Sequence, residues 1–297
     1  MLKSRIIFCI ALALLAIHAS AARAANVIVG VNVEDIGRMN EQQQENLLNQ
    51  LRMNGVSTIR TGILHQGLLE ENIAHFIFGA SKLGIQTVLI VFPHMGGTDR
   101  HTAPANPAMG LPWPVPALSN ADPDGFKKWI APQMAALESA NVRLAAFELG
   151  NEFNTPGFNG DFPTPGSGRI LSVGDLNNAS DAEANGVANG YRAYLKVFAV
   201  LKEVRDASKV NRSTPIILGG LANVDLPSPH SYNKQVAVAI SDSIAFLREH
   251  GLDGLVDGYG VHFYPSRLLK KGARRELLSV IHYLRQDSEM ARARWRQ

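Results

Sequence analysis

The chain of 297 residues is about twice the length of a typical domain, so one large domain or two ordinary ones are possible. Hydrophobic residues make up 46% of it and charged residues 19%, which excludes a disordered chain, a collagen-like repeat and a polytopic membrane protein. The first 24 residues hold three of the 29 basic residues and no acidic one, which leaves 26 residues of each sign. This balance gives no reason to expect a nucleic-acid partner.

Residues 1–24 are predicted to be a secretory signal peptide. Lys3 and Arg5 precede an apolar run of 12 residues at 6–17, which is too short to span a bilayer, and Ala22-Arg23-Ala24 has the small-x-small pattern of a cleavage site. The alternatives are a buried helix or a retained anchor. Cleavage predicts a secreted or periplasmic protein without membrane attachment. It would also remove Cys9, the one cysteine, and so exclude a disulfide scaffold, a cysteine nucleophile and thiolate metal sites.

Short apolar strands alternate with amphipathic helices along the rest of the chain, a pattern typical of βα units around a parallel sheet. The predicted strands are 27–33, 58–63, 86–92, 143–149, 215–221 and 256–263. The predicted helices are 41–53, 72–83, 125–139, 190–207, 235–250 and 274–285. Two long loops rich in Gly and Pro, 93–123 and 155–181, are expected to be functional. We predict one domain at 25–286 and a basic C-terminal tail at 287–297.

Six βα units could form an open doubly wound sheet or an incomplete (β/α)₈ barrel of the TIM type. A Gly-x-Gly-x-x-Gly phosphate loop does not follow the first strand, which removes support for a nucleotide-binding sheet. Polar side chains instead follow nearly every strand, and a barrel gathers such strand ends in one pocket. They are Asn32, Glu34, Arg60, His94, Asn151, Glu152, Asn223, His262 and Tyr264. The pattern favours the incomplete barrel.

The stretch Phe147-Glu-Leu-Gly-Asn151-Glu152-Phe-Asn154 carries the most chemical information. An apolar strand leads into an amide and a carboxylic acid. A partly desolvated carboxyl group can hold a proton near neutral pH, and an amide can both donate to and accept from sugar hydroxyls. The alternative for Glu152 is a helix cap or a salt bridge in a loop.

This stretch resembles the fourth-strand signature of clan A glycoside hydrolases, which are retaining (β/α)₈ enzymes. Its residues are most similar to those of the glucuronidase and xylosidase branches. The resemblance implies that Glu152 is the acid/base and that Asn151 binds the sugar 2-hydroxyl. Gly258-Tyr-Gly-Val-His262-Phe-Tyr264-Pro resembles the sixth-strand signature of the cellulase-like branch. It implies that His262 lines the sugar subsite and that Tyr264 orients the nucleophile, although a satisfied core pair is the alternative.

Two further positions resemble the clan pattern. Arg60 resembles the arginine that keeps the nucleophile carboxylate ionised, and His94 resembles a third-strand histidine; both are expected to bind substrate. Glu148 is expected to be a buried structural carboxylate paired with Arg60. Trp113 could either stack on a sugar or fill its own loop. Neither a metal nor a cofactor is expected, because metal-ligand spacing such as His-Glu-x-x-His does not occur.

The sequence departs from the clan at its C-terminal end. Retaining hydrolysis needs a second carboxylate about 5 Å from the first, and the clan places it after the seventh strand. Glu289 does not follow an apolar run, so we do not expect it to be the nucleophile. The resemblance therefore covers residues 27–286. Three explanations account for the missing nucleophile. The chain is truncated, it is a fragment that another chain completes, or it is a binding protein that has kept a sugar-binding cleft.

The sequence thus predicts an exported hydrolase of β-linked poly- or oligosaccharides that has little activity in the form given. A non-catalytic carbohydrate-binding or scaffold protein of the same fold is the main alternative, and a different exported α/β enzyme is the second. The sequence does not predict which glycan is bound or the oligomeric state.

Overall fold

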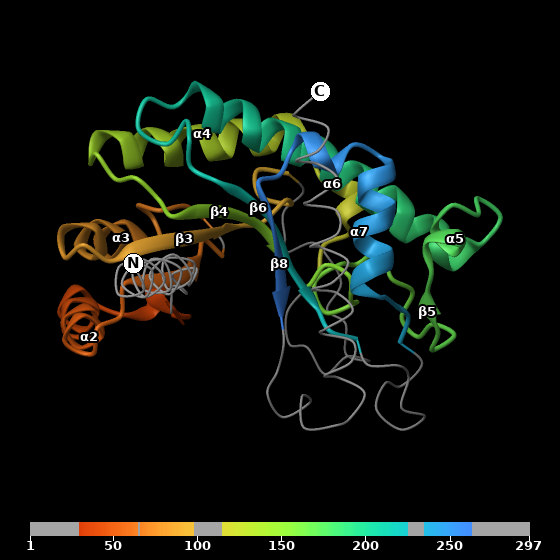
Figure 1. Cartoon of the computed structure of the whole chain (residues 1–297), viewed down its shortest axis with the longest axis horizontal. Coiled ribbons are helices and arrows are strands. Elements are labelled where there is room, and N and C mark those ends of the chain that lie inside the picture. The colour runs from red at the N-terminus through yellow and green to blue at the C-terminus, as the bar shows by residue number, and fades with distance from the viewer. Residues whose placement is uncertain (1–29, 65, 98–114, 225–234, 263–297) are drawn as a thin grey trace, which may run out of the picture.

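A single parallel sheet organises the computed structural model, which describes residues 30–64, 66–97, 115–224 and 235–262 (Figure 1). Its six strands lie in the spatial order β1-β2-β3-β4-β6-β8. They are β1 (Gly30–Asn32), β2 (Thr58–Gly62), β3 (Gln86–Val91), β4 (Ala146–Asn151), β6 (Ile216–Ala222) and β8 (Gly258–His262). The spatial order follows the chain order without reversal, as in a βα barrel, whereas a doubly wound sheet reverses direction at a switch point. The sheet curls into a half-barrel, which confirms the expected incomplete (β/α)₈-type fold, while the helix predicted for the sixth βα unit lies outside the described residues.

Helices cover the outer face of this sheet (Figure 1). The long ones are α2 (Glu41–Met53), α3 (Ile73–Lys82), α4 (Pro123–Ser139), α6 (Ala182–Ala207) and α7 (Ile240–Glu249). Their starts follow local sequence signals: Asn40 and Gln43 form a capping box before α2, and Asp122 caps α4 ahead of Pro123. The remaining elements are η1 (Ile36–Arg38), η4 (Leu118–Asn120), α5 (Val173–Leu176), η5 (Leu252–Gly254) and a two-stranded sheet of β5 (Ile170–Leu171) and β7 (Ala237–Val238).

The hydrophobic core lies between the sheet and these helices. On β2 the side chains of Ile59 and Thr61 are buried under the helices, whereas Arg60 between them is partly exposed and points the other way. The larger buried cluster includes aromatic side chains of α6. The ring centroid of Tyr194 on this helix lies 4.5 Å from that of Phe153, which follows β4. Alternation along the strands therefore buries one set of side chains in the helix layer and leaves the other set for the inner face.

The structure corrects two predicted helices. Helix α6 begins at Ala182 rather than at residue 190, because the Asp181 carboxylate accepts hydrogen bonds from the backbone N–H groups of Glu183 and Ala184. Helix α7 begins at Ile240 rather than at residue 235, because the preceding Ala237 and Val238 form β7. β7 pairs with β5, which lies within the predicted loop 155–181.

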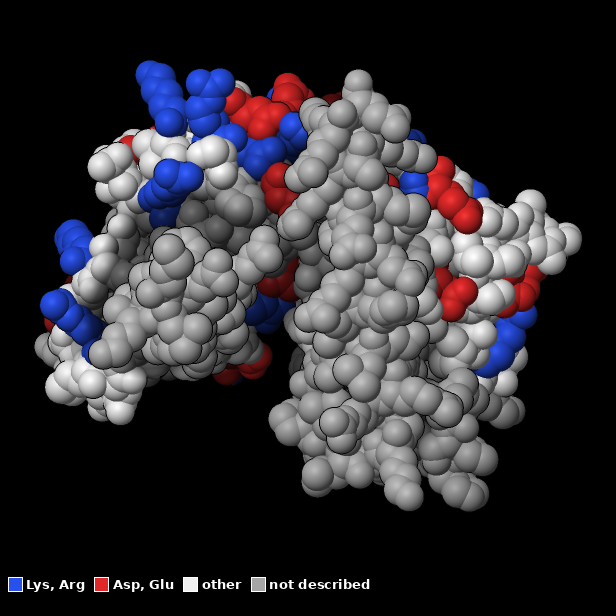
Figure 2. All heavy atoms as spheres, in the orientation of Figure 1, with Lys and Arg blue, Asp and Glu red and all other residues white. Residues whose placement is uncertain are grey.

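Several predictions lie outside the described residues: the signal peptide at 1–24, the start of the first strand at 27–29, the helix at 274–285 and the tail at 287–297. Within the described residues, no helix combines the length and apolarity needed to cross a membrane. Basic and acidic side chains are both spread over the described surface in the view of Figure 2.

Candidate functional site

Four of the predicted site residues lie on or directly after three strands, and three of the four lie at carboxyl ends. Arg60 lies on β2, Asn151 ends β4 and Glu152 follows it, and His262 ends β8. Parallel strands present these ends at one edge of the sheet, which is where βα barrels place their chemistry. Hydrogen bonds join these residues into two pairs.

Arg60 is the centre of the first group. Its Nε and Nη2 atoms donate to the two Glu148 carboxylate oxygens over 2.6 and 2.7 Å, a two-point ion pair. The same guanidinium donates to Asn151 Oδ1 over 3.0 Å and to Asn32 Oδ1 over 3.1 Å. The Glu148 side chain is only 3% exposed, so its carboxylate is buried in an ion pair with Arg60, as expected from the sequence. The arginine in turn orients two amide groups at the sheet edge.

Glu152 and His262 form the second pair. The Oε1 atom of Glu152 lies 2.8 Å from Nδ1 of His262, and the two side chains are 15% and 23% exposed. A proton can lie on either partner of such a contact: the imidazole donates to a carboxylate, or a protonated carboxyl donates to the imidazole. The arrangement can therefore hold and deliver a proton at the edge of the sheet.

The backbone at Glu152 is held in an uncommon conformation. Its φ of 44° lies in the left-handed region, which is costly for a residue other than Gly, and Gly150 two positions earlier has a φ of 79°. The Glu152 N–H donates to the Gly220 carbonyl over 2.7 Å, and the Thr155 N–H donates to the Glu152 carbonyl over 3.0 Å. Strained backbone conformations that neighbouring hydrogen bonds hold in place are concentrated at functional sites. The chain turns sharply at the candidate acid and aims its side chain across β6 toward β8.

Asn154 anchors the turn that follows Glu152. It is fully buried, and its Nδ2 atom donates to the carbonyls of Ala222 and Val238 over 2.9 Å each. Its Oδ1 atom accepts from the Ala222 N–H over 2.9 Å. One amide thus joins the end of β4 to β6 and to β7, which fixes the loop that leaves the candidate site.

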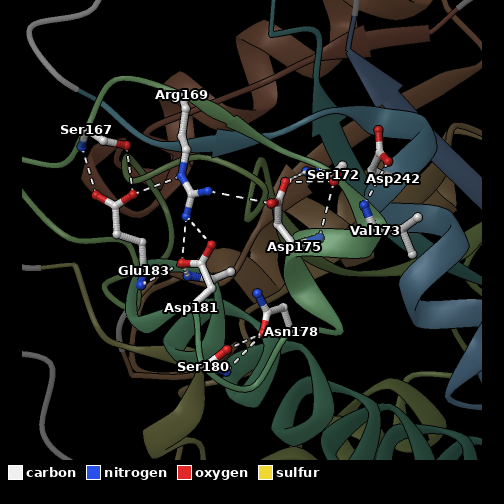
Figure 3. Close-up of polar contacts among 11 residues, drawn as sticks. Ser167, Arg169, Ser172, Val173, Asp175, Asn178, Ser180, Asp181, Glu183 and Asp242 are labelled. Carbon is white, nitrogen blue, oxygen red and sulfur yellow. Dashed lines mark hydrogen bonds and ion pairs between the residues drawn. The ribbon is translucent and has the colours of Figure 1, made fainter.

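The loop 155–181 is held by an ion-pair cluster around Arg169 (Figure 3). The Arg169 guanidinium contacts Asp181 over 2.6 Å, Glu183 over 3.0 Å and Asp175 over 3.5 Å. The Arg169 hydrogen bond lowers the pKa of Asp181, and hydrogen bonds from Ser167 lower the pKa of Glu183, with Arg169 adding to the effect. The cluster fixes the path of this loop where it enters α6.

The same loop is tied to the first long loop by Asp161. Its carboxylate accepts from the Ser119 N–H over 3.0 Å and from the Ser119 hydroxyl. Burial raises the pKa of Asp161, although these hydrogen bonds oppose the rise. Gly190 on α6 makes room for the carboxylate, because an added Cβ there would lie 1.9 Å from Asp161 Oδ2. Helix α6 therefore needs glycine at this position.

The structure brings some of the predicted site residues together and leaves others apart. Arg60 and Asn151 are brought together, as are Glu152 and His262, and the expected Arg60–Glu148 contact is confirmed. His94 follows β3, and its ring lies 5.7 Å from that of Phe92 between centroids. Its role in binding stays a prediction. Tyr264, Trp113 and Glu289 lie outside the described residues. Across the described residues, no group of three or more His, Cys, Asp or Glu side chains is arranged to hold a metal ion.

Sequence reasoning gave no role to Asn154 or Gly220, and it noted Asn32 only as a residue at a strand end. Asn154 could have been singled out as an amide two residues after the Asn-Glu pair. Gly220 lies in a Gly-Gly step inside a strand, a pattern that often marks a bulge or a close approach of backbones.

No protein-family model matches the chain, and no curated protein matches its sequence. An endo-β-1,4-mannanase from Thermotoga petrophila aligns with 81% of this chain at 13% identity and a TM-score of 0.42. The chain spans only 53% of that structure. A hyperthermostable endo-1,4-β-D-mannanase from Thermotoga petrophila RKU-1, solved with maltose and glycerol, aligns over 79% of this chain and 87% of its own, at 10% identity and a TM-score of 0.25.

A dihydropteroate synthase from Xanthomonas albilineans aligns over 86% of this chain and 92% of its own, at 12% identity and a TM-score of 0.24. Similarity at these levels assigns no activity to the chain.

Proposed function

We propose that the protein is an exported glycoside hydrolase that cleaves O-glycosyl bonds of β-linked poly- or oligosaccharides by a retaining mechanism. One observation supports this most strongly. Arg60 on β2 orients the amide of Asn151 at the end of β4. The next residue, Glu152, shares a hydrogen bond with His262 at the end of β8. Amides that bind hydroxyls beside a group that can deliver a proton are one part of what glycoside cleavage requires, and a second carboxylate is the other.

Each residue has a definite part in this proposal. Glu152 donates its proton to the glycosidic oxygen as a nucleophilic carboxylate attacks the anomeric carbon and the glycosidic bond breaks. It later takes a proton from the water that displaces this carboxylate from the sugar. His262 orients the carboxyl group through the 2.8 Å contact. Because Arg60 occupies the Asn151 carbonyl oxygen, the Asn151 NH₂ group is directed to donate to a substrate hydroxyl.

The nucleophile is not assigned among the described residues. Glu148 is the other carboxylate of β4, but it accepts three hydrogen bonds, two from Arg60 and one of 2.8 Å from the Gly220 N–H. A carboxylate bound and buried in this way is unsuited to attack an anomeric carbon. This observation favours a second candidate function, a non-catalytic carbohydrate-binding or scaffold protein that uses the same amide and guanidinium groups.

A panel of soluble β-glycans, assayed for new reducing ends and for binding by calorimetry, tests both functions. Glu152→Gln should reduce the rate of hydrolysis by about 10²- to 10⁴-fold while leaving binding intact. The amide has the same shape as the carboxyl group but cannot donate a proton as an acid. Glu203→Gln is the matched control, since Glu203 is exposed in an ion pair with Lys127 on the helix layer. Binding without hydrolysis would support the second function, and neither binding nor hydrolysis of any glycan would contradict both.

A further inference from the structure

Strand β6 is irregular where it passes the Glu152–His262 pair. Its pairing with β8 shifts register between Leu218 and Leu221: three steps on β6 correspond to the two steps from Tyr259 to Val261 on β8. The extra residue lies in the Gly219-Gly220 step. A bulge of this kind bends a strand and redirects its neighbours, and bulges are frequent beside active sites.

Gly220 lies against Glu148, Glu152 and His262. Its N–H donates to Glu148 Oε1 over 2.8 Å, and its carbonyl accepts from the Glu152 N–H over 2.7 Å. Its open side faces the imidazole of His262: an added Cβ would lie 2.0 Å from Nε2 and 2.4 Å from Cδ2. The ring therefore lies across the glycine, with its opposite nitrogen, Nδ1, directed at Glu152.

Gly219, the neighbouring residue, is small for a different reason. A Cβ there would lie 2.2 Å from the Leu149 carbonyl oxygen, which is backbone that cannot move away. The Tyr194 hydroxyl donates to this same carbonyl over 2.6 Å and accepts from the Gly219 N–H over 3.4 Å. Gly219 thus serves the packing of β4 against β6, whereas the three atoms nearest to a Cβ on Gly220 all belong to one side chain, His262.

We propose that Gly220 is a positioning residue for the Glu152–His262 pair, because its missing side chain forms the slot in which the imidazole lies against the carboxyl group. Any side chain at 220 pushes the ring out of this slot and away from Glu152. The proposal deepens the proposed function, and its catalytic consequence rests on that function. Its geometric part concerns only the two side chains and can be tested without a substrate.

The test is a double-mutant cycle of Gly220→Ala and His262→Ala, read by the ¹³C resonance of the Glu152 side-chain carboxyl group in the full chain. Gly254→Ala is the matched control, because nothing lies within 4 Å of a Cβ at that position. Gly220→Ala should shift the carboxyl resonance in the same way as His262→Ala. In a protein that already carries His262→Ala, it should cause little further shift. Gly254→Ala should leave it unchanged. A Gly220→Ala signal equal to wild type, or fully additive shifts, would overturn the proposal.

Folding and activity supply two further readouts. If Gly220→Ala alone fails to fold, the Gly220→Ala/His262→Ala protein should fold, because the clashing ring is gone; failure of both would overturn the proposal. On a glycan that wild type hydrolyses, Gly220→Ala should lower kcat by about 10²-fold and change the pH–rate profile in the same way as His262→Ala. Shifted resonances in a protein that hydrolyses no glycan would contradict the proposed function and leave the positioning role in place.

Discussion

Replacing Glu148 by Gln should destabilise the protein far more than the same change at an exposed ion pair. Glu148 is 3% exposed and accepts two hydrogen bonds from Arg60 and one from the Gly220 N–H, so the variant leaves a partly buried guanidinium without its counter-charge. Breaking a buried pair costs about 3–5 kcal/mol. Since the Arg60 side chain keeps 23% exposure and can be partly solvated, we expect a value near the lower end of that range, about 3 kcal/mol.

Urea unfolding measures this difference. With an m-value of about 3 kcal/mol/M, the midpoint of Glu148→Gln should fall by about 1 M. Glu203→Gln is the control: its pair with Lys127 is as short, at 2.6 Å, but the side chains are 61% and 48% exposed, so the cost should be at most about 1 kcal/mol. Equal midpoints for the two variants would refute the reasoning, because burial would then not decide the strength of the Arg60 pair.

Two further predictions concern the loop 155–181 and the N-terminus. The lowered pKa values of Asp181 and Glu183 mean that their contribution to stability is present above the ordinary carboxyl values near pH 4 and is lost as the pH falls through the lowered ones. The stability difference between wild type and Arg169→Met should therefore shrink from pH 7 toward pH 3 in urea titrations, and a constant difference would contradict the role of these pairs. Intact mass of the exported protein should place its N-terminus near Ala25; recovery of a chain that starts at Met1 would contradict cleavage.

The alternation of strands and helices could be predicted because local patterns determine it. Apolar β-branched runs and helix stops fix most element positions to within a few residues, and the Asn-Glu pair after β4 identified the candidate site directly. The Arg60–Glu148 contact was also predictable, because a buried carboxylate on one strand needs a cation on another.

Long-range partners explain what could not be predicted. β7 replaces the first turn of a predicted helix because Ala237 pairs with Ile170, a partner far away in the sequence. The left-handed conformation of Glu152 depends on the Gly220 carbonyl, and the position of His262 depends on the absence of a side chain at that same glycine. A strand glycine on its own indicates only that backbones approach closely, not which side chain uses the space.

If the protein is a glycoside hydrolase, Glu152 and Asn151 face the glycosidic bond of a bound sugar. A crystal structure of Glu152→Gln with a β-linked oligosaccharide selected from the binding panel tests it most directly. The carboxamide at 152 should lie within hydrogen-bond distance of a glycosidic oxygen, and the Asn151 NH₂ group should donate to a hydroxyl of the adjoining sugar. An oligosaccharide bound away from the carboxyl ends of β4 and β8 would contradict the roles proposed for Glu152 and Asn151.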